Sequence, residues 1–122
     1  NYKKKKPSGE DFVIEVDGKF AGMIGIHKIT YDPWSKHMAK IDYWLKKEYR
    51  GRGIMPKAVR IIAEYGFKKY KLVRVQASSR TYNKGSMRAL EKAGFKFEGI
   101  LRKYVCKDGK YHDNAMFSKI RK

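Results

Sequence analysis

The segment that joins a β-type run to a helical run reads Tyr49-Arg50-Gly51-Arg52-Gly53-Ile54-Met55. The β-type run before it covers residues 40–45, and the helical run after it covers residues 56–67. A glycine-rich turn that leaves a strand and opens a helix directs several backbone N–H groups at one place, where the helix dipole adds positive potential. The segment therefore predicts a site for phosphate groups.

The spacing of this turn excludes two common nucleotide-binding motifs. It lacks the G-x-x-x-x-G-K-[ST] of a P-loop and the G-x-G-x-x-G of a dinucleotide fold. Gly51 and Gly53 allow the backbone to approach an anion and to adopt positive φ. The predicted phosphate-binding residues are Arg50, Gly51, Arg52, Gly53, Ile54 and Met55.

Four segments of the chain resemble one enzyme family. The turn is similar to the R-x-x-G-x-[G/A] pyrophosphate loop of the GNAT acetyltransferases, with Met55 in place of the usual small third residue. Residues 83–99 resemble the N-x-x-S-x-R-x-x-E-K-x-G-F-x-x-E-G block of its RimJ/RimL-type branch. Residues 41–45 resemble that branch's I-G-Y-W-L strand, and residues 108–113 its D-G-x-Y-x-D hairpin. The matches occur in family order across roughly residues 12–120.

The resemblance implies an α/β protein with a mixed sheet, the acyl-CoA N-acyltransferase fold. It also implies an enzyme that moves the acetyl group of acetyl-CoA to a primary amine by direct attack. The strand that ends Tyr43-Trp44-Leu45 is expected to pair its backbone with the pantetheine arm of the cofactor. Asn83 matches the family asparagine that approaches this arm, and Arg88 is placed to reach a phosphate.

The catalytic residues are less strongly specified by the resemblance. Many members carry a general-acid tyrosine seven residues after the asparagine, but Leu90 stands there. Ser86 is the predicted cofactor contact and acid for the leaving sulfur; the alternative is a serine that serves only the helix start. Asp42 is the candidate base, or else a strand residue that faces a cation. Tyr104 and Tyr43 are further candidate hydroxyls, with simple packing as their alternative.

Hydrophobic periodicity predicts the element order β-β-β-α-β-α-β-β. Residues 1–10 read as a basic lead-in, and residues 11–122 as the acetyltransferase domain, whose family normally begins with a further strand and two helices. The chain is thus a fragment or a shortened member. The expected strands cover residues 11–16, 19–30, 37–45, 72–77, 95–105 and 111–120, and the helices run from 56 to 67 and from a cap at Asn83 or Ser86 to Gly94.

Composition limits the class of protein. A chain of 122 residues with 42% hydrophobic content suits one folded domain. No apolar run approaches the roughly 20 residues that span a bilayer, so no membrane partner is expected. The single cysteine, Cys106, gives no sign of an oxidising compartment, and the cytoplasm is the default location. The three histidines have no companion ligands at metal-binding spacing, so no metal is expected.

The formal net charge of +18 bears on partners. It favours polyanions such as the phosphates of coenzyme A or ribosomal RNA, although lysines spread over every face would give the same sum. The acceptor amine is open between a protein N-terminus and a small amine. The alternative function is a non-catalytic basic module that binds RNA or the ribosome. An uncovered strand edge would invite a second copy, so a homodimer is a further open prediction.

Overall fold

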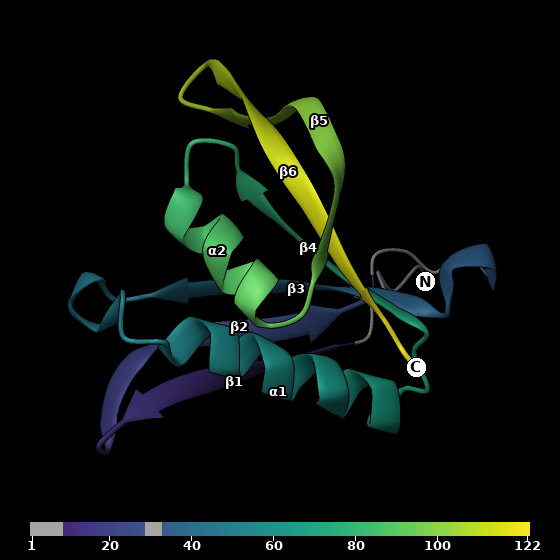
Figure 1. Ribbon diagram of the computed structural model, residues 1–122, viewed down its shortest axis with the longest axis horizontal. Coiled ribbons are helices and arrows are strands. Elements are labelled where there is room, and N and C mark those ends of the chain that lie inside the picture. Colours follow the sequence, from purple (N-terminus) through teal and green to yellow (C-terminus); the bar gives the residue numbers. More distant parts are fainter. Residues whose placement is uncertain (1–8, 29–32) are drawn as a thin grey trace, which may run out of the picture.

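The computed structural model describes residues 9–28 and 33–122, and their element order confirms the predicted one (Figure 1). Residues 29–32, where the second predicted strand ends and the following loop begins, lie outside the described residues, as do residues 1–8 of the lead-in. The elements are β1 (Gly9–Val16), β2 (Lys19–His27), β3 (Met38–Leu45), α1 (Ile54–Lys69), β4 (Arg74–Arg80), α2 (Lys84–Lys92), β5 (Lys96–Lys107) and β6 (Lys110–Ile120), with short 3₁₀ turns at Pro33–Ser35 and Lys47–Tyr49.

The strands form one six-stranded sheet in the order β1-β2-β3-β4-β6-β5. β3 and β4 run parallel, and each other neighbouring pair is antiparallel. α1 contacts β2 and β3, α2 contacts β4 and β5, and the helices contact each other, so both lie on the same side of the sheet (Figure 1). The α/β architecture with a mixed sheet is therefore as predicted.

The hydrophobic core lies between the sheet and the helices. Alternation along β4 buries Val75 and Ala77 on the helix side, as the period of a strand requires. On β6, Phe117 is directly opposite Ala77 and is 1% exposed. α1 presents its apolar stripe to β2, where Gly66 is so close to Ile26 that an added Cβ would meet its Cδ1 at 2.5 Å.

The two sequence-predicted tight turns adopt the expected backbone conformation. Asp17 and Gly18 connect β1 to β2 with φ of 52° and 78°, and Asp108 and Gly109 connect β5 to β6 with φ of 52° and 75°. Aspartate followed by glycine tolerates two positive φ angles, which the tight turn of a hairpin demands. These two hairpins form the antiparallel strand pairs at the two ends of the sheet, β1 with β2 and β5 with β6.

Element boundaries differ from the prediction by a few residues, and those of β4 and β1 have a clear physical cause. β4 begins at Arg74 rather than residue 72, because Lys71 has a positive φ of 57° and Leu72 is buried in the connection. The strand then continues to Arg80, since its serines pair with β6 opposite Met116 and Ala115 despite their polarity. β1 begins at Gly9, inside the predicted lead-in, because Gly9 and Glu10 pair with the end of β2.

The carboxylate of Glu10 ties the start of β1 to the end of α1. It accepts hydrogen bonds from Tyr65 Oη at 2.6 Å, from Lys69 Nζ at 2.9 Å and from Tyr70 Oη. The bonds from the two tyrosines, followed by that from Lys69, lower the pKa of Glu10 to about 2. A carboxylate with a depressed pKa stabilises the fold while it remains ionised.

Replacing Glu10 with glutamine is expected to lower the midpoint of thermal unfolding at pH 7. Because the pKa of Glu10 lies below its ordinary value of 4.5, the stabilisation is complete above pH 4.5 and is lost as the pH falls toward 2. The difference between wild type and variant should therefore shrink over that window in melts followed by circular dichroism. Glu15→Gln, on the exposed face of the same strand, is the control; equal shifts for both variants at pH 7 would contradict the expectation.

Two further acidic residues hold parts of the sheet together. Glu98 forms a two-pronged ion pair with the Arg74 guanidinium, at 2.7 and 2.8 Å, and accepts a hydrogen bond from Ser118. The Arg74 contact, and then the Ser118 hydroxyl, lower the pKa of Glu98 to about 2. Asp113 accepts a hydrogen bond from the N–H of Lys103 at 2.8 Å, which holds a bulge of β5 against β6.

Candidate active site between the diverging strands

β3 and β4 separate shortly after they meet. Their pairing consists of Met38 with Arg74, Ala39 with Val75 and Lys40 with Gln76, and no further pair forms in the described ranges. The later parts of both strands remain bound to their outer neighbours, β2 and β6. A wedge therefore opens between β3 and β4, in the middle of the sheet.

The edge of β3 that faces this wedge presents backbone hydrogen-bonding groups. The N–H of Lys46 donates to the carbonyl oxygen of Ala21 at 2.7 Å, so the peptide groups of Leu45 point the opposite way, toward β4. Peptide groups alternate in direction along an antiparallel strand, so those of Tyr43 also face the wedge. Tyr43 and Leu45 thus offer a partial strand edge to an extended ligand.

The turn after β3 ends this edge with two left-handed glycines. Gly51 and Gly53 both have φ of 76°, and a Cβ added to either would meet nothing within 4 Å. Glycine is therefore needed here for its backbone conformation rather than for space. The two glycines turn the chain from the β3 edge directly into the first turn of α1.

The N-terminus of α1 retains its anion-binding capacity. Within the described part of the chain, no side chain caps the helix at Gly53 and no acidic residue lies in the first turn. The N–H groups of Ile54 and Met55 therefore lack the partners that a capped helix would provide, and Pro56 has no N–H to satisfy. The side chain of Met55 is buried in the core, so only its backbone is available to this site.

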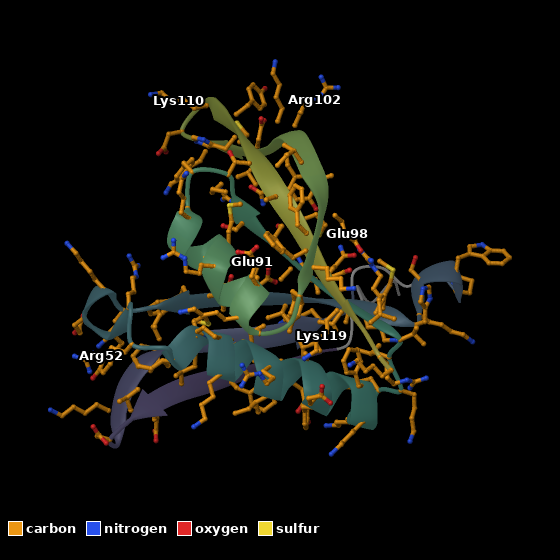
Figure 2. All side chains as sticks on the ribbon, in the orientation of Figure 1. Arg52, Glu91, Glu98, Arg102, Lys110 and Lys119 are labelled. Atoms are coloured by element: carbon orange, nitrogen blue, oxygen red, sulfur yellow. The ribbon has the colours of Figure 1, made fainter. Side chains whose placement is uncertain are left out.

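The two arginines of the turn have different positions. Arg50 folds back so that its Nε donates to the carbonyl oxygen of Leu45 at 3.0 Å, which leaves its terminal nitrogens beside the wedge. The Arg52 guanidinium instead lies over the ring of Tyr49, 5.4 Å from its centre. Arg52 lies at the outer end of the loop before α1 (Figure 2).

The opposite wall of the wedge is the start of α2. Asn83 is its N-cap, and its Oδ1 accepts a hydrogen bond from the N–H of Ser86 at 3.0 Å. Of the two predicted cap residues, Asn83 is therefore the one that forms the cap. Since capping uses only the amide oxygen, the amide nitrogen of Asn83 remains a donor at the cavity wall.

A hydroxyl pair spans the wedge from β3 to α2. Tyr43 Oη and Ser86 Oγ are 2.7 Å apart. Burial raises the pKa of the Tyr43 phenol, and the hydrogen bond with Ser86 opposes this only in part. Tyr43 is therefore a neutral phenol at physiological pH, held against the serine from an element 43 residues away in sequence.

These walls enclose a cavity of about 480 Å³. This volume is typical of sites that hold small molecules and cofactors. Its lining includes most of the residues that the sequence predicted for the cofactor: Tyr43, Trp44, Leu45, Arg50, Gly51, Gly53, Ile54, Met55, Asn83, Ser86 and Arg88.

Three predicted site residues do not line the cavity. Asp42 points to the sheet face opposite the helices, where its side chain is 65% exposed and lies 3.7 Å from Lys40. Arg52 is on Tyr49 at the outside of the loop. Tyr104 is 55% exposed on β5, in a hairpin whose end, marked by Arg102 and Lys110, projects away from α1 (Figure 2).

Sequence reasoning did not predict five lining residues: Tyr49, Pro56, Gly85, Ala89 and Lys92. Lys92 follows Arg88 by four residues, a spacing that places both on one face of a helix, so helical periodicity would have found it. Its carbonyl oxygen accepts a hydrogen bond from Arg60 of α1 at 3.1 Å, which joins the two helices beside the cavity.

The cavity suits a long ligand with phosphate groups at one end. A strand edge, free helix N–H groups and the cations Arg50, Arg88 and Lys92 surround it. Coenzyme A has that form: a pantetheine arm with amides, followed by a pyrophosphate.

Among the described residues, no three His, Cys, Asp or Glu side chains gather as metal ligands. Neither does any helix in this part of the chain have the length and apolarity to cross a membrane.

Comparison with known proteins agrees with this geometry. A model of the GNAT acetyltransferase domain matches residues 1–96. The chain is 39% identical over 102 residues to the probable N-acetyltransferase YjcK of Bacillus subtilis (strain 168), covering 84% of this chain and 55% of that protein. It spans about half the length of the curated relatives that it matches.

Two solved structures have a similar fold. The ribosomal-protein-S5-alanine acetyltransferase from Vibrio fischeri aligns with a TM-score of 0.80 and 34% identity, over 90% of this chain and 60% of that one. RimJ from Mycobacterium smegmatis, in complex with CoA-disulfide, aligns with a TM-score of 0.82 and 31% identity, over 92% of this chain and 53% of that one.

Proposed function

This chain belongs to the GNAT acetyltransferase family, and from that membership we propose that it forms the cofactor-binding part of an acetyl-CoA-dependent N-acetyltransferase. One observation carries the proposal: the open edge of β3 leads, through two left-handed glycines, into the uncapped start of α1 inside a single cavity. A structural turn would need neither the free strand edge nor the free helix N–H groups. Together they match an extended ligand that ends in phosphates.

The residues of the cavity divide the work of binding. The N–H groups at the start of α1, with Arg50 and Arg88, hold the phosphates. The backbone of Tyr43 and Leu45 pairs with the amides of the pantetheine arm, as a strand edge pairs with an added strand. Asn83 donates to the same arm from the opposite wall. Bound acetyl-CoA supplies an acetyl group already activated as a thioester.

The chemistry requires few protein groups because the amine attacks the thioester directly. A strand N–H of the β3 edge would stabilise the negative charge that develops on the acetyl oxygen. Ser86 donates its hydroxyl proton to the leaving sulfur. Water removes the proton from the incoming amine, since the carboxylate of Asp42 faces the other side of the sheet.

The acceptor is a primary amine, and a protein N-terminus is the class that the similar structures favour. The Vibrio fischeri relative acts on the alanine of ribosomal protein S5, as its name states. The net charge of +18 opposes the approach of strongly cationic acceptors. We therefore propose neutral or acidic protein N-termini, rather than polyamines, as the acceptors of the acetyl group.

The alternative of a non-catalytic RNA-binding module gains no comparable support. Its basis is net charge, whereas the cavity combines an open strand edge, an uncapped helix and a hydroxyl pair in one place. Nucleic-acid binding through phosphates would need none of these three features, and it would weaken steeply with salt.

The test is a calorimetric titration of acetyl-CoA into the chain, repeated with Arg50→Ala. Wild type is expected to bind at micromolar concentration, and the substitution should weaken binding by about 1–3 kcal/mol, the scale of a charge-assisted contact. Arg52→Ala is the matched control, because its guanidinium lies on Tyr49 outside the cavity, and it should bind nearly as wild type.

An acceptor assay completes the test. Acetyl transfer is measured with a peptide that begins with alanine, with the same peptide blocked at its N-terminus, and with spermidine. Transfer to the free peptide alone would support the proposal. No binding of acetyl-CoA by the folded chain would contradict it, and binding without transfer to any amine would restrict the chain to holding the cofactor.

A further inference from the structure

The hydroxyl pair in the wedge points to a specific role for Tyr43, which the sequence offered only as a further candidate hydroxyl. We propose that Tyr43 supplies, through Ser86, the proton that the leaving sulfur takes during acetyl transfer. This inference rests on the proposed function, and it concerns the side chain of Tyr43 rather than its backbone. The contact that carries it is the 2.7 Å separation of Tyr43 Oη and Ser86 Oγ.

The acid strengths of the three groups favour a relay. An aliphatic hydroxyl is a far weaker acid than a thiol, so a serine alone loses a proton to a thiolate only at great cost. A phenol, with an ordinary pKa near 10, is closer to a thiol, whose pKa is about 8.5 for cysteine. A serine that receives a proton as it gives one away never becomes an alkoxide. The contact with Tyr43 gives Ser86 a source for that replacement proton.

Either oxygen of the pair can donate this hydrogen bond, and the relay uses the arrangement in which Tyr43 is the donor. Burial raises the pKa of Tyr43, so the phenol retains its proton and can donate it to Ser86 Oγ. The N–H of Ser86 is already bound to the Asn83 cap, which fixes the residue in the first turn of α2. The hydroxyl proton of Ser86 is then free to point into the cavity that Ser86 itself lines.

The step balances with water as the only further participant. As the amine nitrogen bonds to the acetyl carbon, the carbon–sulfur bond breaks and its electron pair remains on sulfur. Ser86 Oγ gives its proton to that sulfur and takes the proton of Tyr43 Oη. The tyrosinate then regains a proton from water, which has received the proton released by the attacking amine. Tyr43 and Ser86 end as they began.

The charged groups that line the same cavity act on the sulfur as well. Arg50, Arg88 and Lys92 each favour a thiolate by their positive charge, whether or not the relay operates. None of them is changed by a substitution at Tyr43 or Ser86. Differences between variants at these two positions therefore report the hydroxyl pair and not the cationic wall.

The test uses coenzyme A itself and measures the pKa of its bound thiol from the ultraviolet absorbance of the thiolate. Donation by a hydroxyl stabilises the thiolate, so the thiol of bound coenzyme A should titrate below that of free coenzyme A. Ser86→Ala should raise the pKa of the bound thiol by about one unit, the scale of a hydrogen bond to a charged group. Tyr43→Phe should raise it by a smaller amount.

The decisive variant is Tyr43→Phe combined with Ser86→Ala. If the proton passes through Ser86, the double variant should titrate as Ser86→Ala does, because loss of the serine already disconnects the tyrosine. Additive shifts would show two independent donors and overturn the relay. Ser86→Thr, which keeps a hydroxyl, should give the bound thiol a pKa close to that in wild type.

Two controls separate a relay from mere packing. Tyr82→Phe removes one phenol hydroxyl from an exposed tyrosine that does not line the cavity, and it should leave the pKa of the bound thiol unchanged. Calorimetry should give Tyr43→Phe the same affinity for coenzyme A as wild type within about threefold. A wild-type pKa of the bound thiol in Tyr43→Phe would reduce Tyr43 to a packing role, whereas failure of wild type to bind coenzyme A would overturn the proposed function as well.

Discussion

Replacing Ser86 with alanine is expected to lower the rate of acetyl transfer by about 10²–10⁴-fold, the range typical of a lost general acid. Ser86 Oγ is the hydroxyl that joins α2 to Tyr43 inside the cavity, and alanine removes both the donor and its link to the phenol. The N-cap should survive, since it uses the backbone N–H of residue 86. The measurement is the steady-state rate at saturating acetyl-CoA with the alanine-initiated peptide.

Affinity for acetyl-CoA should change little in this variant, because the residues proposed to hold the phosphates and the β3 edge are unchanged. A loss confined to kcat is the mark of an interaction formed in the transition state rather than on binding. Ser35→Ala, in the 3₁₀ turn before β3, serves as the control for a lost serine that does not line the cavity. A Ser86→Ala rate within threefold of wild type would remove Ser86 from the mechanism.

Replacing Phe117 with alanine is expected to lower the free energy of unfolding by about 3–5 kcal/mol, the cost of deleting a buried aromatic ring. Phe117 is 1% exposed on β6, and its ring packs edge-to-face on Phe97 with 5.6 Å between the ring centres. A domain of this size has a total stability of roughly 5–15 kcal/mol, so the loss would leave little reserve. Urea unfolding followed by circular dichroism measures it.

Phe20→Ala is the matched control for this substitution. Phe20 is 40% exposed on β2 and contacts Trp44 edge-to-face, so its removal leaves no enclosed cavity. Its cost should be well below that of Phe117→Ala. Equal costs would mean that the core between α2 and β6 relaxes to fill the space left by the larger deletion.

The sequence was sufficient for those features that depend on local chemistry. The turns at Asp17-Gly18 and Asp108-Gly109 were predicted because few residue pairs accept two positive φ angles. The glycine turn that joins β3 to α1 was predicted because its glycines lie between a strand-like and a helix-like run. The order of elements followed from hydrophobic periods of about 2 and 3.6.

Features that depend on long-range register were not accessible in the same way. Asp42 and Tyr43 are adjacent in sequence, but the alternation of a strand places one on each face of the sheet, and only packing decides which one meets the helices. The sequence did not distinguish Arg52 from Arg50, because the contact of the Arg52 guanidinium with the Tyr49 ring depends on the folded loop. The contact of Tyr43 with Ser86 joins residues 43 positions apart, a pairing that no local pattern encodes.

The short ladder between β3 and β4 has a consequence for how the chain unfolds. In the described ranges, the sheet connects β1–β3 to β4–β6 through three residue pairs. The contacts of α1 with α2 and β4, and the Tyr43–Ser86 hydroxyl pair, add to this connection. Each half is held together by longer strand pairings of its own. We therefore expect the boundary between the two halves, the seam, to separate first on unfolding. A ligand that pairs with β3 and touches α2 bridges this seam from both sides. A bound cofactor would therefore make the two halves unfold as one cooperative unit. Saturation with cofactor would also raise the stability of the protein toward unfolding.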